Sequence, residues 1–152
     1  MKTQSAFVRL TAFVAVILIL MIGLMACSST PAATAGVKGG TGPAINLTGD
    51  AAKGADIFSA NCVACHGDLG KGGVPNPGSD DGVIPALNPI DPGMANADAK
   101  VFATNIDPYI EHGSKPEGTN PTLTMKAFAD QNILSAQNIA DVIAYVISLN
   151  KK

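Results

Sequence analysis

The stretch that decides the fold reads Cys62-Val63-Ala64-Cys65-His66. Two thiols and an imidazole stand within five consecutive positions, and two residues separate the cysteines. This is the spacing of a c-type haem attachment site. Each sulfur can add to one vinyl group of the porphyrin, and the histidine that follows binds the iron on the proximal side. The motif therefore predicts one covalently attached haem c, held by Cys62, Cys65 and His66.

Two other uses of paired cysteines compete with this interpretation. A redox dithiol of the thioredoxin type needs a strand before the pair and a helix after it, whereas residues 67–82 are rich in Gly, Pro and Asp. A structural zinc site needs about four ligands, and outside the motif the chain offers only His112 and the distant Cys27. Haem attachment is the use that the motif favours.

The sequence around the motif resembles the class I c-type cytochrome family, over about residues 48–149. Gly54, Phe58 and Cys62 recur at helical spacing, as in the family's N-terminal helix. Tyr145 stands where the family has an aromatic residue that crosses this helix. The resemblance implies an all-α, small cytochrome c-like fold of about three to five short helices around one haem. No segment alternates with period two, so strands are not expected.

The stretch Ile84-Pro85-Ala86-Leu87-Asn88 resembles the proline loop of this family. In that loop the proline carbonyl accepts a hydrogen bond from the proximal histidine, which fixes the tautomer of the imidazole and strengthens its donation to iron. The resemblance assigns this role to Pro85, with Pro89 as the alternative.

The stretch Met125-Lys126-Ala127-Phe128 resembles the segment that supplies the family's axial methionine. Lys126 replaces the proline that usually follows the methionine, which removes some rigidity. Met94 and His112 are the alternative ligands. Met94 lies in a predicted turn, and His112 ends a predicted helical turn, where the helix dipole favours a cation. The resemblance therefore predicts His66 and Met125 as the metal ligands.

The clearest helix is expected at the C-terminus, with Ser135 as its N-cap. One face of this helix is apolar and consists of Ile139, Val142, Ile143, Val146 and Leu149. A middle helix is expected over about residues 97–105. It is followed by a separate helical turn in which Asp107 is the cap and Pro108 the first residue.

Residues 1–26 read as a signal peptide or membrane anchor. Lys2 and Arg9 form its positive region, and residues 10–26 are an uncharged apolar stretch of 17 residues. It ends in Leu24-Met25-Ala26-Cys27, which resembles a bacterial lipobox. Cleavage before Cys27 would expose a thiol that carries lipid. The alternative is an uncleaved anchor, and in both cases the bilayer is a partner through Cys27 or residues 10–26.

Residues 27–49 are predicted to be the lipidated cysteine and a flexible linker, because their composition is dominated by Ser, Thr, Pro, Ala and Gly. The cytochrome c domain is then expected over residues 50–152. Thioether bonds of this family form outside the bacterial cytoplasm. The resemblance therefore implies an exported protein, anchored to the outer (periplasmic or extracellular) face of the cytoplasmic membrane.

Charge limits the partners of the domain. Without Lys2 and Arg9, eight lysines face twelve acidic residues, a net charge of −4 before the haem is counted. A nucleic-acid partner is therefore not expected. Six acidic residues cluster between the proline loop and the middle helix, and they suggest either a solvated face or a docking surface for a basic partner. They are Asp80, Asp81, Asp91, Asp98, Asp107 and Glu111.

No catalytic group accompanies the motif, so the chain is expected to be an electron-transfer protein rather than an enzyme. It would pass single electrons to or from a membrane respiratory or photosynthetic complex or another redox protein, or serve as the haem c subunit of such a complex. With both His66 and Met125 bound, the iron would have no open position. If Met125 were not a ligand, the alternative would be a five-coordinate haem protein that binds a gas or peroxide.

Overall fold

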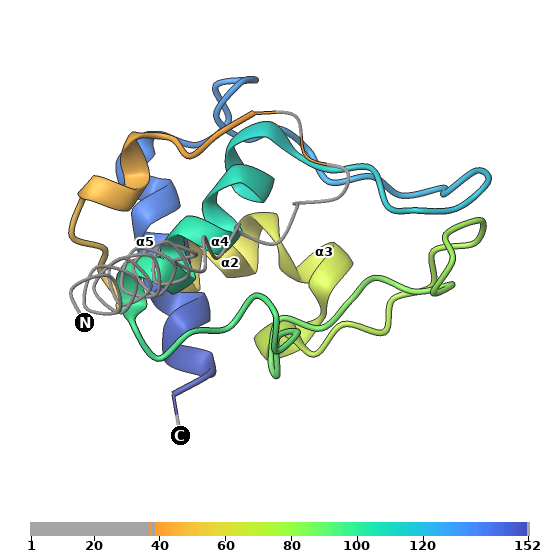
Figure 1. Ribbon diagram of the computed structural model, residues 1–152, viewed down its shortest axis with the longest axis horizontal. Coiled ribbons are helices and arrows are strands. Elements are labelled where there is room, and N and C mark those ends of the chain that lie inside the picture. Colours follow the sequence, from red (N-terminus) through yellow and green to blue (C-terminus); the bar gives the residue numbers. More distant parts are fainter. Residues whose placement is uncertain (1–36, 38, 152) are drawn as a thin grey trace, which may run out of the picture. The chain divides into compact units, whose positions relative to one another are not determined.

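The computed structural model describes residues 37 and 39–151. Four α-helices and two short 3-10 helices form this part of the chain (Figure 1). In chain order they are η1 (Pro43–Asn46), α2 (Ala51–Asn61), α3 (Val63–His66), η2 (Asp68–Gly70), α4 (Ala99–His112) and α5 (Ala136–Leu149). Within the described residues, β-type pairing is limited to isolated bridges. The all-α, cytochrome c-like fold expected from the sequence is confirmed.

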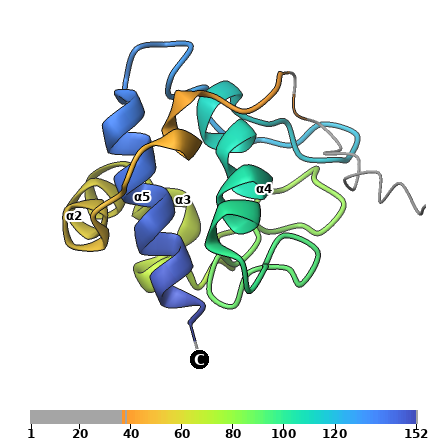
Figure 2. The same cartoon turned by 60° about the vertical axis from the view of Figure 1, so that its left-hand side comes forward.

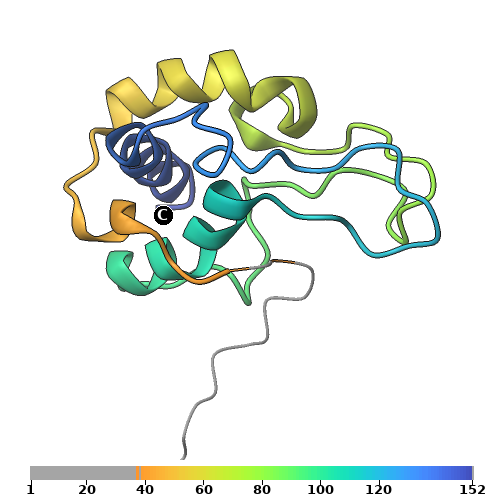
Figure 3. The same cartoon turned by 90° about the horizontal axis from the view of Figure 1, so that it is seen from above.

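The two terminal helices, α2 and α5, cross in close contact, and α5 lies between α2 and α4 (Figures 2 and 3). Gly54 is buried at the crossing, where a Cβ atom would collide with the carbonyl of Asp141. One turn later, the ring of Phe58 packs on that of Tyr145. The predicted crossing of the N-terminal helix by Tyr145 is therefore confirmed.

Local signals in the sequence set the ends of both helices. Asp50 caps α2 through its carboxylate, which accepts the N–H groups of Ala52 and Lys53. Ser135 caps α5 and forms a capping box with Asn138. The apolar face of α5 is buried as its period predicts. Its buried apolar residues are Ile139, Ala140, Val142, Ile143 and Val146.

The middle helix is longer than expected. It runs without a break from Ala99 to His112, is capped by Asp98, and contains Pro108 in its interior. The prediction of a separate turn capped by Asp107 is therefore wrong. A proline inside a helix loses one backbone hydrogen bond, and burial of apolar side chains on both sides of Pro108, at Ile106 and Ile110, offsets this cost.

The described part of the predicted linker packs on the helices. Ala44 in η1 is 2% exposed and belongs to the core. Lys100 of α4 donates from Nζ to the Ile45 carbonyl and, at 2.9 Å, to Asn46 Oδ1. The Gly42 N–H donates to the Asp107 carboxylate at 2.6 Å. The expectation of a flexible chain up to residue 49 therefore differs from the structure, because Ala, Gly and Pro can fill small gaps as readily as they form linkers.

The proposed signal at residues 1–26 and the proposed lipid site Cys27 lie outside the described residues. Among residues 37 and 39–151, no helix combines the length and the apolar character needed to cross a bilayer.

Two long loops extend from the helices side by side (Figures 1 and 3). We call residues 73–84 the proline-side loop, because Pro85 follows it, and residues 114–125 the methionine-side loop, because it ends at Met125. Backbone bonds join them, from the Thr122 N–H to the Pro77 carbonyl at 3.1 Å and from the Asn120 N–H to the Gly78 carbonyl at 3.2 Å. The two loops therefore hold the Pro85 and Met125 segments in relation to each other.

Candidate cofactor-binding site

The cysteine–histidine motif lies on one helical turn at the end of α2. Cys62 lies between the two helices and is both the C-cap of α2 and the N-cap of α3. The N–H groups of Cys65 and His66 donate to the Cys62 carbonyl at 3.1 and 2.9 Å. All three side chains are half-buried. A local backbone turn therefore presents both thiols and the imidazole from one small segment.

The two thiols are free and do not form a disulfide with each other. Burial, together with the smaller effect of the neighbouring Cys65, raises the pKa of Cys62 to about 11. A catalytic dithiol needs a thiolate near neutral pH, and therefore a lowered pKa. The environment of Cys62 disfavours a thioredoxin-type role and suits a thiol that reacts once, during maturation.

His66 contacts the backbone of the predicted proline loop. Its Nδ1 atom lies 3.3 Å from the Pro85 carbonyl oxygen. A carbonyl can only accept, so this contact favours the tautomer with the proton on Nδ1 and leaves Nε2 with its lone pair. Burial lowers the pKa of His66, and the Pro85 carbonyl partly opposes that effect. A neutral imidazole with a free Nε2 is the form that binds a metal.

Glycines bring the Pro85 segment up to His66. The Gly72 N–H donates to the His66 carbonyl at 2.6 Å, and the Leu87 N–H donates to the Gly70 carbonyl at 2.7 Å. Gly72 has a φ of +66°, and a Cβ atom there would collide with the backbone of Ala86. Only glycine fits such a conformation at so close an approach. The backbone of Gly70 and Gly72 is thus bonded to both His66 and the segment that follows Pro85.

Met125 is half-buried, packs against the core and is held by the backbone that follows α4. Its N–H donates to the Ser114 carbonyl at 2.9 Å, and the Ser114 N–H donates back at 3.3 Å. Gly113, with a φ of +68°, lets the chain pass against the Met125 carbonyl. This pairing supplies rigidity at the segment where Lys126 stands in place of the usual proline.

The two alternative ligands differ in how their side chains are engaged. Both ring nitrogens of His112 face acceptors, since Nδ1 lies 2.9 Å from Asp130 Oδ2 and Nε2 lies 3.0 Å from the Gly40 carbonyl. An imidazole bound in this way has no nitrogen left for iron. Met94 is half-buried at the end of a turn that its N–H closes with the Asp91 carbonyl at 2.9 Å.

The zinc alternative lacks a ligand set in the part of the chain that the structure describes. No group of three or more His, Cys, Asp and Glu side chains there is arranged to hold a metal ion. His112 therefore does not complete a four-ligand zinc site with Cys62, Cys65 and His66.

The six acidic residues do not form one surface. Asp107 is 0% exposed and Glu111 is 5% exposed. Asp98 uses its carboxylate to cap α4. The prediction of a single acidic face is therefore wrong for Asp107 and Glu111, because the period of α4 turns both of them inward, whereas Asp98 is exposed. Asp80, Asp81 and Asp91 are exposed.

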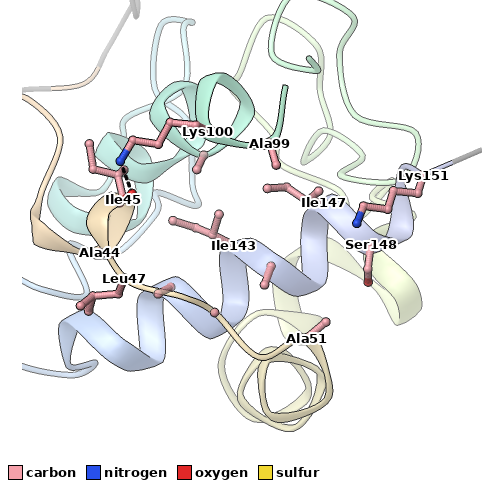
Figure 4. A pocket seen from close by; sticks show the side chains of 14 residues that line it. Ala44, Ile45, Leu47, Ala51, Ala99, Lys100, Ile143, Ile147, Ser148 and Lys151 are labelled. Carbon is pink, nitrogen blue, oxygen red and sulfur yellow. Dashed lines mark hydrogen bonds between the residues drawn. The ribbon is translucent and has the colours of Figure 1, made fainter. Parts of the chain in front are cut away.

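A pocket of about 410 Å³ lies between η1, the start of α4 and α5 (Figure 4). Ile143 and Ile147 of α5 form its apolar floor, and Lys100 and Lys151 stand at its edge. None of the cysteine–histidine motif, Pro85 or Met125 lines it. It is therefore a feature separate from the candidate site.

One residue that joins the proline-side loop to the methionine-side loop was not predicted from the sequence. Asn76 is 0% exposed, and its side chain hydrogen-bonds to the backbone of Leu123. It stands between Pro75 and Pro77, a context that predicts an exposed turn. Its partner is 47 positions away, so no local pattern could reveal the contact.

Comparison with known proteins gives one match. The family model described as cytochrome c matches residues 51–150. No curated protein and no solved structure matches the chain.

Proposed function

The chain belongs to the cytochrome c family, and from this premise we propose that it is a membrane-tethered mono-haem protein that exchanges single electrons with a membrane complex. Membership gives it a covalently attached haem c and a role in electron transfer. The proposal adds the residues that hold the haem, the tether and the class of partner. It rests most on one observation, the position of two free thiols beside an imidazole whose Nδ1 faces the Pro85 carbonyl.

The donors in the structure fit haem c. Cys62 and Cys65 supply the two thiols for thioether bonds, and His66 supplies Nε2 as the proximal ligand. Pro85 orients the imidazole through Nδ1. Met125 supplies a half-buried thioether from a segment that is paired with Ser114. Thiol, imidazole and thioether are the groups that this cofactor needs.

The proposed chemistry is transfer rather than catalysis. When bound, haem c supplies a one-electron iron couple. His66 and Met125 would both hold the iron, which would leave no position on it for water or a substrate. A thioether ligand favours the reduced state and raises the potential.

The membrane part of the proposal is supported by the sequence at the N-terminus. The apolar residues 10–26 precede Cys27, and the chain is already packed on the helices at residues 42–46. The candidate tether therefore lies between Cys27 and these packed residues, and is shorter than the composition of residues 27–49 predicts. The tether would hold the domain close to the bilayer, where membrane redox complexes are its partners.

Covalent attachment is tested by extracting the purified protein with acid–acetone and by staining denaturing gels for haem peroxidase activity. We expect haem to stay on the polypeptide in both. Cys62→Ser and Cys65→Ser should each weaken retention, and the double variant should abolish it, whereas Ser59→Ala on the exposed side of α2 is the control. Complete loss of haem from the unmodified protein would reject the proposed attachment.

The electron-transfer role is tested with membranes that contain the respiratory or photosynthetic complexes of the source cell. We expect the haem to be reduced and reoxidised on addition of donor and acceptor substrates, and the unmodified reduced protein to bind carbon monoxide weakly. Avid carbon monoxide binding would instead support a five-coordinate haem that binds a gas or peroxide.

A further inference from the structure

Asn76 is buried in the contact between the proline-side loop and the methionine-side loop, with 0% of its surface exposed. Its Oδ1 accepts the Leu123 N–H at 2.7 Å, and its Nδ2 donates to the Leu123 carbonyl at 3.1 Å. The Thr122 hydroxyl donates to the same Oδ1 at 3.2 Å. One side-chain amide thus satisfies both backbone groups of Leu123, as a neighbouring strand would.

The backbone of Asn76 is fixed within its own loop. Its N–H donates to the Gly82 carbonyl at 2.8 Å, and its carbonyl accepts from the N–H and the hydroxyl of Ser79 at 3.1 and 2.8 Å. Pro75 and Pro77 restrict the chain on both sides. The amide is therefore presented from a constrained position rather than from a flexible tip.

Each loop leads to a residue of the candidate site. The proline-side loop ends at Ile84, and the next residue, Pro85, offers its carbonyl to His66. On the methionine-side loop, Leu123 lies two positions before Met125. A displacement of Leu123 relative to the proline-side loop would therefore move Met125 relative to His66.

The other backbone bonds between the loops, including those from Thr122 to Pro77 and from Asn120 to Gly78, join exposed residues. The Asp80 N–H donates to the Glu117 carbonyl at 2.9 Å, and both residues are exposed. Water can replace such bonds at little cost, whereas a buried amide that loses its partners remains unsatisfied. Asn76 is therefore the contact that sets the spacing of the two loops.

We propose that Asn76 is a positioning residue that holds Met125 at the haem iron by fixing the methionine-side loop to the loop that carries Pro85. This inference rests on the proposed role of Met125 as the sixth ligand. A thioether is a weak acceptor, so its bond to a metal depends on how well the protein holds it in place. Asn76 would control ligand occupancy and reduction potential without touching the metal.

The inference is tested on the haem-loaded protein with Asn76→Ala, Asn76→Asp and Thr122→Val. The first removes all amide contacts, the second keeps the shape but removes the Nδ2 donor, and the third removes one donor to Oδ1. Asn105→Ala is the matched control, because Asn105 likewise holds a loop through its side-chain amide. Its Nδ2 donates to the Met94 carbonyl at 3.0 Å. Three measurements are made on each variant: the far-red band of iron–thioether coordination, the reduction potential, and the affinity of the oxidised protein for added imidazole, which competes with Met125.

We expect Asn76→Ala to weaken the far-red band, lower the potential and raise the affinity for imidazole roughly tenfold or more, since leaving the backbone groups of Leu123 without their partner shifts a closed-to-open equilibrium by about that factor. Thr122→Val should have a smaller effect in the same direction, with Asn76→Asp between the two. Asn105→Ala should leave all three readouts close to those of the unmodified protein. If Asn76→Ala does not yield folded protein, the graded effects of Asn76→Asp and Thr122→Val decide the question.

Two negative results can be told apart. If the unmodified protein shows the far-red band and Asn76→Ala keeps that band and the same imidazole affinity, Asn76 has a purely structural role and this inference is wrong. If the unmodified protein shows no such band, Met125 is not the sixth ligand, and the proposed ligand set is wrong together with the inference. Amide hydrogen exchange at Leu123, measured with the same samples, reports whether the loop contact was broken.

Discussion

The ring of Phe58 packs on the ring of Tyr145, with centroids 5.3 Å apart and planes tilted by 59°. These residues come from α2 and α5, and their contact is possible because Gly54, one turn earlier, lets the two helices approach until its α-carbon faces the backbone of Asp141. Tilted aromatic pairs add stability beyond the area they bury. The crossing of the terminal helices is thus held by one small residue and one aromatic pair.

We expect Gly54→Ala to destabilise the protein, although alanine is the better helix former by about 1 kcal/mol. The added Cβ would collide with the Asp141 carbonyl, which cannot move without bending α5. Overpacking of this kind costs about 1–3 kcal/mol, so the two terms should leave a net loss of up to about 2 kcal/mol in the free energy of unfolding. Guanidinium unfolding of the haem-loaded protein measures it.

Gly40→Ala is the matched control for that measurement, because a Cβ at Gly40 would meet nothing within 4 Å. A Gly54→Ala variant that is as stable as Gly40→Ala would contradict the close helix crossing.

The helix crossing could be predicted from the sequence because its signals are local. Gly54 and Phe58 recur at helical spacing, and Asp50 and Ser135 carry side chains that cap the helices that follow them. The length of α4 could not be predicted in the same way. Pro108 reads locally as a helix start, and only the burial of Ile106 and Ile110 against other elements keeps the helix continuous.

The features of the candidate site fall into the same two groups, those that local sequence predicts and those that depend on distant contacts. The cysteine–histidine motif is contiguous, so its chemistry is readable from five residues. The contacts that hold the site join distant positions, such as Asn76 with Leu123 and His112 with Gly40. Such contacts leave no periodic pattern in a single sequence. The packing of residues 39–49 was missed for this reason as well.

We expect Met125→Leu to abolish the far-red iron–thioether band and to lower the reduction potential, because leucine keeps the volume but has no sulfur. Met94→Leu is the matched control and should keep both, since Met94 is similarly half-buried against the core. Visible spectra and potentiometric titration check this. Loss of the band in Met94→Leu alone would reverse the assignment of the ligand.

We expect His112 to make the folded protein more stable at mildly acidic pH than at alkaline pH. The Asp130 carboxylate raises the pKa of His112, and the Gly40 carbonyl adds to the effect. Because the folded pKa lies above the unfolded value of about 6.5, the stabilisation is fully present below that value and is lost as pH rises through the folded pKa. Unfolding measured from pH 5 to 9 should show this loss.

The same series on His112→Gln should be flatter above pH 6, and NMR titration of the His112 ring should give a midpoint above that of an unfolded peptide. A midpoint at or below the peptide value would contradict the pairing of His112 with Asp130.

We expect Glu111→Gln to raise stability at neutral pH. Glu111 is 5% exposed and its Oε1 atom has no hydrogen-bond partner. Burial raises its pKa, and Asp107 adds to the effect. A raised carboxyl pKa means that stability present below the unfolded value of about 4.3 is lost as pH rises through the folded value. Glutamine does not ionise, so Glu111→Gln should raise the free energy of unfolding by about 1 kcal/mol at pH 7. This difference from the unmodified protein should vanish near pH 4.

Exposed Glu117 supplies the control for that experiment, since Glu117→Gln should change stability little at either pH. Chemical unfolding at pH 4 and pH 7 compares the three proteins. Equal stability of Glu111→Gln and the unmodified chain at pH 7 would indicate that the Glu111 carboxylate is solvated.

We expect Cys27→Ser to block maturation at the N-terminus. Cys27 follows an apolar stretch of 17 residues that ends in a small residue, Ala26, and lipid attachment needs its thiol. The variant should accumulate as a longer precursor that is not labelled by a radioactive fatty acid, while Ser28→Ala is processed and labelled normally. Gel mobility, mass of the extracted protein and lipid labelling measure this. Normal processing and labelling of Cys27→Ser would exclude Cys27 as the lipidated residue, whereas an unmodified chain that is neither shortened nor labelled would leave residues 10–26 as an uncleaved anchor.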